Sequence, residues 1–301
     1  MSVRPVRRIV RATPHLEGAG VKLQRGFGFG DTAEFDPFLL FDDFRNDSPE
    51  DYLAGFPWHP HRGIETITYV LAGNVAHGDS LGNRGNLGAG DVQWMTAGSG
   101  IMHQEMPQGD AQGRMHGFQL WANLPSSLKM TAPRYQDIAA TDIPEVVDDD
   151  GTRVRVIVGD FWGKKGPVEG VAADPQYLDV SVPPGRRKRL ALDTSRHAFA
   201  YVFAGSGAFR DASQPHGVLT EAVDGTDAVT RERTGNRSLV LFDSGDEVVV
   251  QAGDEGIRFL LVSGKPIEEP VAWYGPIVMN TKTELQQALT ELRNGTFIKT
   301  R

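Results

Sequence analysis

Hydrophobic residues along this chain fall in short runs rich in β-branched and aromatic side chains, and clusters of Gly, Asn and Asp bound these runs. This pattern is typical of strands joined by turns. Helical periodicity is absent from most of the chain. We therefore expect an all-β fold. The expected strands are 65–71, 92–96 and 118–121 in the first half, and 153–161, 177–182, 199–205, 238–242, 247–252 and 257–264 in the second.

The pattern changes near the C-terminus, where apolar residues recur at helical spacing. These residues are Leu285, Ala288, Leu289 and Leu292. Thr281 and Glu284 have the spacing of a capping box, and Gly295 stands where a helix commonly ends. We expect one short closing helix at about 281–294.

A polar, proline-dotted stretch at 125–151 separates the two groups of strands and is typical of a connection. A chain of 301 residues is long enough for two domains that each bury a core. We predict an N-terminal unit at 1–135 and a C-terminal unit at 136–301 that includes the closing helix.

The composition excludes several classes of partner and of metal site. The formal charge of -8 arises from mixed charges rather than one acidic run, so direct binding of nucleic acid is not expected. The sequence has 0 Cys, which excludes disulfides and thiolate-bound metals and leaves nitrogen and oxygen as ligands. No apolar segment of about 20 residues occurs, and the N-terminus has no apolar run of signal-peptide length. We expect a cytoplasmic protein that does not enter a membrane.

Two pairs of metal-binding side chains stand out in the first half. His59 and His61 are two residues apart, and so are His103 and Glu105. Positions i and i+2 of a strand point to the same face, so two neighbouring strands would place three imidazoles and a carboxylate around one point. This donor set suits Fe, Mn, Ni, Cu or Zn rather than Ca or Mg. An octahedral ion would keep two open positions, which indicates catalysis or sensing.

Glu65 is an alternative source of the carboxylate, because it shares strand parity with the first histidine pair. Gly63 interrupts that stretch, and we favour Glu105, which is two residues from His103. Glu105 is also the first candidate for a catalytic base and Glu65 the second. His77 and His116 lie outside the pattern, and we expect them at the surface or behind the ligands.

The chain contains an internal repeat. The segment YVLAG at 69–73 returns as YVFAG at 201–205, and residues 75–79 return at 207–211 with the same spacing. A further match pairs Gly100 with Gly256. In the second copy the positions of the four candidate ligands are taken by Ala191, Asp193, Phe259 and Leu261. We therefore expect one metal site, in the first unit.

Five long motifs resemble those of the pirin family, which are two-domain members of the cupin superfamily. They are FDPFLLFDDF at 35–44, HPHRGIETITYVLAGNVAHGDS at 59–80, LGAGDVQWMTAGSGIMHQEMP at 87–107, GFQLWANLP at 117–125 and EPVAWYGPIVMNT at 269–281. The second metal-binding motif departs from the general cupin form, with Thr96 where proline is usual. Pirins share this departure and take their carboxylate ligand from that motif, which supports Glu105 over Glu65.

The resemblance implies two tandem cupin β-barrels, with iron bound in the first by His59, His61, His103 and Glu105. It also implies quercetin 2,3-dioxygenase activity, in which O₂ opens a flavonol with release of carbon monoxide. Our leading hypothesis is a metal-dependent dioxygenase with Fe(2+) as cofactor and a flavonol-like small molecule and O₂ as substrates. The alternatives are an iron-dependent redox-sensing regulator that binds a transcription factor or a metabolic enzyme, and a metal that only stabilises the barrel.

Overall fold

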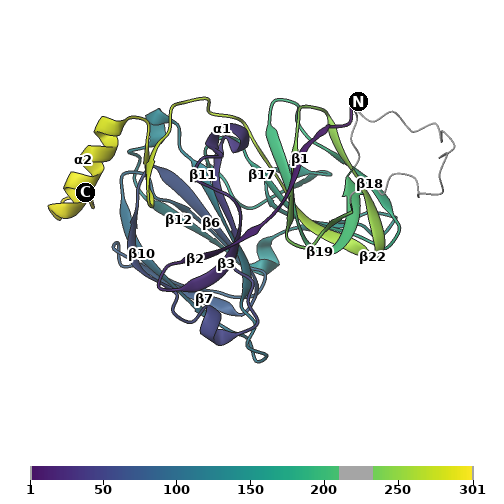
Figure 1. Cartoon of the computed structure of the whole chain (residues 1–301), viewed down its shortest axis with the longest axis horizontal. Coiled ribbons are helices and arrows are strands. Elements are labelled where there is room, and N and C mark those ends of the chain that lie inside the picture. Colours follow the sequence, from purple (N-terminus) through teal and green to yellow (C-terminus); the bar gives the residue numbers. More distant parts are fainter. Residues whose placement is uncertain (1, 210–232, 300–301) are drawn as a thin grey trace, which may run out of the picture. The chain divides into compact units, whose positions relative to one another are not determined.

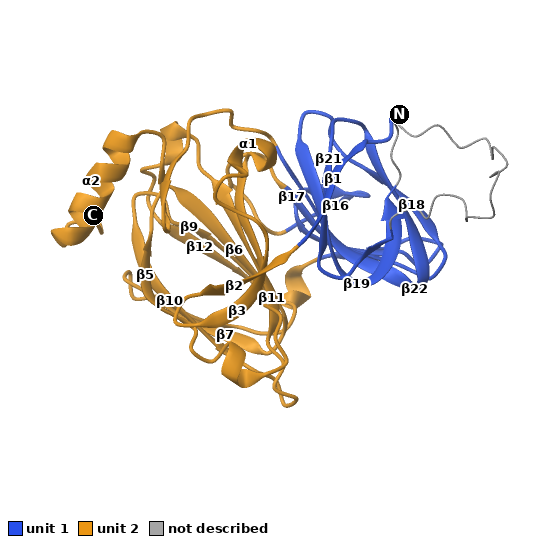
Figure 2. Cartoon of the chain, viewed as in Figure 1, with its two compact units in different colours: residues 1–11, 144–166, 176–264 blue, residues 12–143, 167–175, 265–301 orange. Residues whose placement is uncertain are grey.

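The computed structural model describes residues 2–209 and 233–299, in two compact units that are each discontinuous in sequence. Unit 1 comprises residues 1–11, 144–166 and 176–264, and unit 2 comprises residues 12–143, 167–175 and 265–301 (Figure 2). Each terminal segment thus lies in the unit opposite to the one that the predicted division at 135 gives it. The first eleven residues belong with the second half of the chain, and the last 37 residues, 265–301, belong with the first half.

Unit 2 consists mainly of two antiparallel sheets and a hairpin (Figure 1). The seven-stranded sheet has the order β12 (Arg134–Ile138), β9 (Val92–Thr96), β6 (Ile64–Ala72), β11 (His116–Asn123), β4 (Phe38–Asp43), β3 (Val21–Phe27) and β2 (Thr13–Glu17). The four-stranded sheet has the order β5 (Phe56–His61), β10 (Ile101–Gln108), β7 (Asn74–Asp79) and β8 (Arg84–Leu87). The hairpin pairs β23 (Ala272–Tyr274) with β24 (Ile277–Met279).

Unit 2 also contains the helical segments that occur among the described residues. They are α1 (Thr32–Phe35), η1 (Pro49–Asp51), η2 (Ser126–Leu128), η3 (Ala140–Asp142) and the closing helix α2 (Lys282–Arg293). The capping box of α2 is formed as predicted: the Glu284 N–H donates to the Thr281 side chain, and the Thr281 N–H donates to the Glu284 carboxylate. Ala288 packs against the β24 side of the unit, in a cluster with Ile277 and Met279. The closing helix therefore belongs to unit 2, whereas the sequence assigned it to the second domain.

Unit 1 is built on one nine-stranded antiparallel sheet and a small hairpin. The main path is β1 (Val6–Arg11), β21 (Ser238–Phe242), β19 (His197–Phe209), β22 (Glu247–Gly264), β17 (Gln176–Val182), β14 (Arg153–Val158) and β13 (Glu145–Val147). In addition β18 (Arg187–Ala191) pairs with β22, β20 (Thr234–Gly235) pairs with β19, and β15 (Asp160–Phe161) pairs with β16 (Lys164–Lys165).

The two strands predicted at 247–252 and 257–264 form one long strand, β22, rather than two. Its first part pairs with β18 and its second part with β17, so the polar residues between them mark a bend where the partner changes. Gly256 lies at φ +79 in this bend, a conformation that glycine adopts without strain. The last two residues of the predicted repeat, Arg210 and Asp211, lie outside the described residues.

The interiors of the two units differ. In the described part of unit 1 a large apolar cluster includes Phe259 and Leu261, which the repeat places at the positions of His103 and Glu105. In unit 2 the buried apolar residues form several smaller clusters, and part of one of them lines a cavity. The all-β prediction is confirmed. Within the described residues no helix is long and apolar enough to cross a membrane.

Candidate metal centre

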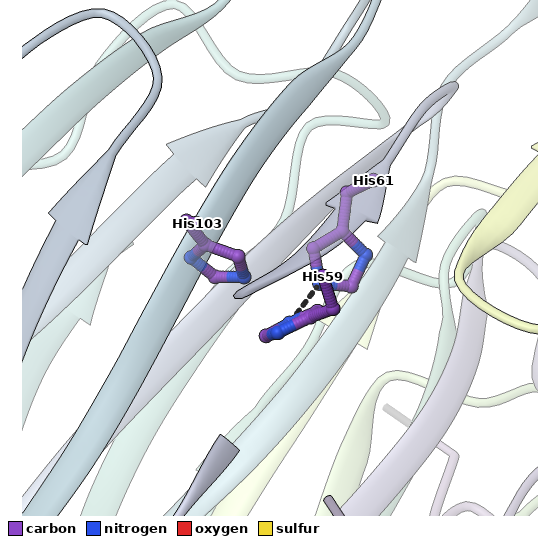
Figure 3. A group of neighbouring side chains, drawn as sticks. All are labelled: His59, His61 and His103. Atoms are coloured by element: carbon purple, nitrogen blue, oxygen red, sulfur yellow. Dashed lines mark hydrogen bonds between the residues drawn. The ribbon is translucent and has the colours of Figure 1, made fainter. Parts of the chain in front are cut away.

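Three histidines of unit 2 converge on one point, as the i and i+2 spacing predicts (Figure 3). His59 and His61 come from β5 and His103 from β10, and the antiparallel register sets His103 directly opposite His59. One ring nitrogen of each residue lies within 4.8 Å of those of the other two. Strand pairing therefore brings together two sequence segments that are some forty residues apart.

Two backbone carbonyl groups orient the first histidine pair. Nδ1 of His59 lies 2.8 Å from the Pro57 oxygen, and Nδ1 of His61 lies 3.3 Å from the Pro276 oxygen. A carbonyl oxygen only accepts, so each Nδ1 carries the proton and each Nε2 is left with a lone pair. The two Nε2 atoms face each other at 3.1 Å. Two nitrogens bound to neighbouring positions of one ion, each about 2.1 Å from it, are separated by about 3 Å. The spacing fits a shared metal.

His103 supplies the third nitrogen. Both of its ring nitrogens are buried, and neither has a hydrogen-bond partner within the described part of the chain. Burial, and after it the neighbouring histidines, lowers the pKa of His61 and of His103 well below the usual value. Metal ligands must be neutral imidazoles, so the low pKa keeps these two residues ready to bind. A buried polar atom without a partner is costly, and a bound cation would remove that cost.

Glu105 lies on the same face of β10 as His103, but its carboxylate is outside the group of three nitrogens. The side chain is buried, and Oε1 lies 3.1 Å from the Thr68 hydroxyl, which also lies 2.7 Å from Oε1 of Gln119. Burial raises the pKa of Glu105, whereas His59 and the Thr68 hydrogen bond lower it in part. The carboxylate is therefore next to the histidine cluster and anchored to the opposite sheet.

Glu65 takes no part in this arrangement. Gly63 adopts φ +76 between β5 and β6, and the chain passes there from the four-stranded to the seven-stranded sheet. Glu65 and Thr68 differ by an odd number of residues on β6, so their side chains lie on opposite faces, and only Thr68 lines the cavity. Oε1 of Glu65 accepts from Thr96 instead. The turn at Gly63 resets the strand parity, so Glu65 lies away from the cavity lining, and its role as second candidate for the base stays a prediction.

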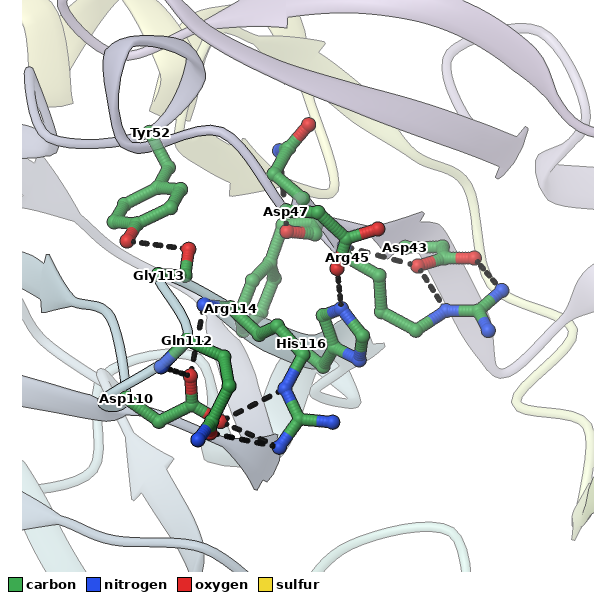
Figure 4. A network of polar contacts seen from close by, with 11 residues as sticks. Asp43, Arg45, Asp47, Tyr52, Asp110, Gln112, Gly113, Arg114 and His116 are labelled. Atoms are coloured by element: carbon green, nitrogen blue, oxygen red, sulfur yellow. Dashed lines mark hydrogen bonds and ion pairs between the residues drawn. The ribbon is translucent and has the colours of Figure 1, made fainter.

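His77 and His116, the two further histidines considered above, lie outside the cluster. His77 is buried on β7 beside Glu105, and its Nε2 lies 2.9 Å from the amide of Gln93. His116 is half-buried and lies 2.7 Å from Asp47, in a network of polar contacts that also holds the pair Arg114 and Asp110 (Figure 4).

A cavity of about 620 Å³ within unit 2 opens on the candidate metal site. This volume is in the range of small-molecule binding sites. His59, His61 and Glu105 form part of its wall. Much of the rest is aromatic, and this aromatic lining consists of Phe29, Phe44, Tyr52, Phe56, Trp58, Trp121 and Trp273. The rings of His61 and Trp121 meet edge to face at 5.1 Å, so the aromatic wall begins at the metal site itself.

Sequence reasoning missed the polar residues of the cavity and the carbonyl group that orients His61. Thr68 and Gln119 lie in strands whose neighbours are apolar, and each strand alone gives no sign that they meet. Pro276 lies within the motif at 269–281, where no local pattern indicates a contact with His61. In the sequence, the sign of such a cavity residue is a polar side chain within an otherwise apolar strand.

Both the sequence and the fold of the chain match those of known proteins. Residues 20–122 match the pirin family, and residues 177–298 match the pirin C-terminal cupin domain. A pirin-like protein from Caulobacter vibrioides is 44% identical over 298 residues, which cover 99% of this chain and 100% of that protein. Pirin from Homo sapiens is 37% identical over 295 residues, which cover 97% and 93%. A quercetin 2,3-dioxygenase from Acinetobacter baumannii has a similar structure, with a TM-score of 0.84 at 30% identity, covering 98% of this chain and 99% of that one. The predicted pair of cupin domains is confirmed, and the chain belongs to the pirin family.

Proposed function

We propose that the protein is a metal-dependent dioxygenase of the quercetin 2,3-dioxygenase type, which opens a flavonol-like substrate with O₂. One observation carries the proposal: a cluster of three imidazoles with a buried carboxylate beside it forms the wall of an aromatic-lined cavity. A structural metal site is normally closed on all sides, whereas this one faces a space of ligand size. The solved dioxygenase from Acinetobacter baumannii supports the same reaction class.

His59, His61 and His103 would hold the metal, with Glu105 as the fourth ligand. When bound, the metal would supply a Lewis acid for a deprotonated substrate oxygen and a centre for reaction with O₂. Fe(2+) is our first choice, and Mn, Ni, Cu and Zn suit the same nitrogen and oxygen donors. The unpartnered nitrogens of His103 and the facing Nε2 atoms of the other two histidines support this assignment.

The protein's own residues would bind the substrate and move one proton. The aromatic wall favours a flat ring system, because offset or edge-to-face contacts with the neighbouring rings of Trp121 and Trp273, whose centroids lie 6.1 Å apart, replace water against it. A carboxylate at the metal end of the cavity can take the proton of a substrate hydroxyl, and Glu105 is the residue in position to do so. Thr68 then acts as a positioning residue, since it holds Oε1 of that carboxylate.

The test is turnover of quercetin by protein loaded separately with each of the five metals, with and without O₂. We expect an O₂-dependent loss of flavonol absorbance and release of carbon monoxide with at least one of the metals. The His61→Ala variant should lose both signals, and His116→Ala, a matched histidine of the same unit, should keep them. Absence of O₂-dependent loss in protein shown to hold each metal would contradict the proposal.

A second candidate is an iron-dependent regulator whose affinity for a transcription factor or metabolic enzyme changes with the oxidation state of the metal. The hydrogen bond from His61 to Pro276 favours it, because it links a metal ligand to the C-terminal segment that carries α2. Pull-down from cell extract under reducing and oxidising conditions tests it. Identical sets of partners under the two conditions would count against this function.

A further inference from the structure

A row of polar side chains crosses the seven-stranded sheet along the wall of the cavity. Arg25 on β3 pairs with Asp42 on β4, Asp42 with Gln119 on β11, and Gln119 with Thr68 on β6. Residues that are opposite one another in register project from the same face of a sheet. All four side chains line the cavity. The row begins beside Glu105, at Thr68, and ends at Arg25.

The far end of the row is charged. Nε and Nη2 of Arg25 each donate to one oxygen of Asp42, both at 2.8 Å, and Nη2 also lies 2.9 Å from Oε1 of Glu17. The Asp42 side chain is 7% exposed and that of Arg25 is 18% exposed. Burial raises the pKa of Asp42, although the Arg25 hydrogen bonds lower it in part. A desolvated ion pair of this kind gives little net stability compared with apolar residues of similar volume. Folding stability therefore does not explain why this pair lines the cavity.

Arg25 keeps donor capacity for a ligand. Its Nη1 has no hydrogen-bond partner among the described residues, and the guanidinium is part of the cavity wall. Glu17 is half-exposed, at 42%, and offers carboxylate oxygens to the same space. A ligand hydroxyl both donates and accepts, so it can bind Arg25 and a carboxylate at the same time. One guanidinium and two carboxylates carry a net negative charge, which disfavours an anionic ligand.

The separation of the two ends matches an elongated ligand. Three strand spacings separate Thr68 from Arg25, which corresponds to about 14 Å across the sheet. A three-ring aromatic molecule of flavonol size has about this length. One end of such a molecule would reach the histidine cluster while hydroxyl groups at the other end reach Arg25.

We propose that Arg25, Asp42 and Glu17 form a distal subsite that selects uncharged aromatic ligands bearing hydroxyl groups at the end remote from the metal. The proposal rests on the function proposed above and specifies its substrate class. It concerns recognition and not the reaction, so it can be tested without turnover.

The experiment compares two probes, quercetin and 3-hydroxyflavone, which has the same ring system without the peripheral hydroxyl groups. Binding is followed through quenching of tryptophan fluorescence, because Trp58, Trp121 and Trp273 line the cavity. Zinc-loaded protein in the absence of O₂ is used, since zinc has no redox chemistry. We expect quercetin to bind at least about tenfold more tightly, the effect of one hydrogen bond to a charged group.

The main variant is the double substitution Arg25→Met with Asp42→Leu, which removes both charges and preserves volume. It should bring the ratio of the two affinities close to one, mainly by weakening quercetin. Glu17→Ala leaves the buried ion pair in place and should lower the ratio in part, so the proposal stays testable if the double variant does not fold. The matched control is Arg114→Met with Asp110→Leu, an ion pair of the same unit at 2.7 Å that does not line the cavity (Figure 4).

An unchanged affinity ratio in a folded double variant, or in Glu17→Ala where the double variant does not fold, would overturn the proposal. So would wild-type protein that binds both probes equally or binds neither. Failure of the dioxygenase proposal has a different signature: the preference for quercetin persists, but no carbon monoxide is released with any of the five metals when O₂ is supplied.

Discussion

The imidazole of His61 donates through Nδ1 to the carbonyl oxygen of Pro276, which is 215 residues further along the chain, at a distance of 3.3 Å. A carbonyl behind a metal-binding histidine fixes its tautomer and the direction of its free nitrogen. The residue next to His61 strengthens the same connection. The buried guanidinium of Arg62 donates to Glu291 of α2 and to the Phe297 oxygen, both at 2.7 Å, and lies 4.1 Å from the centre of the Phe297 ring. The C-terminal segment is therefore fastened next to the strand that carries His59 and His61, two of the proposed metal ligands.

Replacement of Arg62 by Met should loosen this segment. Two buried hydrogen bonds from a charged group are lost, and we expect the free energy of unfolding to fall by about 3 kcal/mol. Metal affinity should fall as well, because Pro276 is held less firmly against His61. Urea unfolding and competition with a chelator measure the two effects. Lys299→Met is the control: this more exposed partner of Glu291 should contribute less than about 1 kcal/mol. Equal losses in the two variants would contradict the role of Arg62.

The choice of carboxylate gives a second prediction. Glu105→Gln keeps the volume of the side chain but removes its charge, and metal affinity should drop by more than about tenfold, since even changes behind the ligands have that effect. Glu65→Gln should leave metal affinity unchanged, because Glu65 lies on the opposite face of β6 from the cavity. Metal content after dialysis against a chelator distinguishes the two. Loss of metal in Glu65→Gln alone would reverse the assignment.

The outcome for these carboxylates shows what the sequence could and could not predict. The i and i+2 spacing was enough to converge His59, His61 and His103, because it needs only the alternation of one strand. The same alternation does not extend to Glu65, because the turn at Gly63 places it in a different sheet from His59 and His61. The row from Arg25 to Thr68 depends on the register of four strands, and Pro276 reaches His61 from the far end of the chain. Contacts of that kind are set by tertiary structure and leave no local pattern.

Thr68 gives a third prediction, with a matched pair of residues. Its hydroxyl lies 3.1 Å from Oε1 of Glu105 and 2.7 Å from the amide oxygen Oε1 of Gln119, and turning the Gln119 amide by 180° would place its NH₂ group there instead. One hydroxyl has one proton, so Thr68 donates to Glu105 when the NH₂ group of Gln119 faces it. Thr68→Val should reduce turnover of quercetin by about tenfold or more, a larger effect than its loss of folding stability would explain.

The control for Thr68 is Thr96→Val. Thr96 is equally buried and donates to Glu65 at 2.7 Å, on the face of the sheet that does not line the cavity. This variant should lose a similar amount of stability and keep its turnover. A decrease of turnover in both variants would mean that the hydroxyl groups act through general stability and not through Glu105.

Lys129 gives a prediction about pH. The side chain is 2% exposed, and Nζ donates to the Gly63 oxygen at 2.8 Å and to Oδ1 of Asn123 at 2.6 Å. Burial lowers its pKa from 10.5 to about 7, although Glu269 and Glu284 raise it in part. Between pH 7 and 10.5 the unfolded chain therefore holds a proton that the folded protein has lost. The free energy of unfolding gains from this residue as pH rises through that window, by up to about 1.4 kcal/mol per pH unit.

The measurement is urea unfolding at several pH values between 7 and 10 for wild type and for Lys129→Met. The variant should be less stable overall, because two hydrogen bonds are lost, and its stability should rise less steeply with pH. Lys282→Met removes an exposed lysine of the same unit and should retain the wild-type slope. A slope for Lys129→Met equal to that of wild type would show that Lys129 stays protonated in the folded protein. The turn at Gly63 would then be held by an ammonium group rather than by a neutral amine.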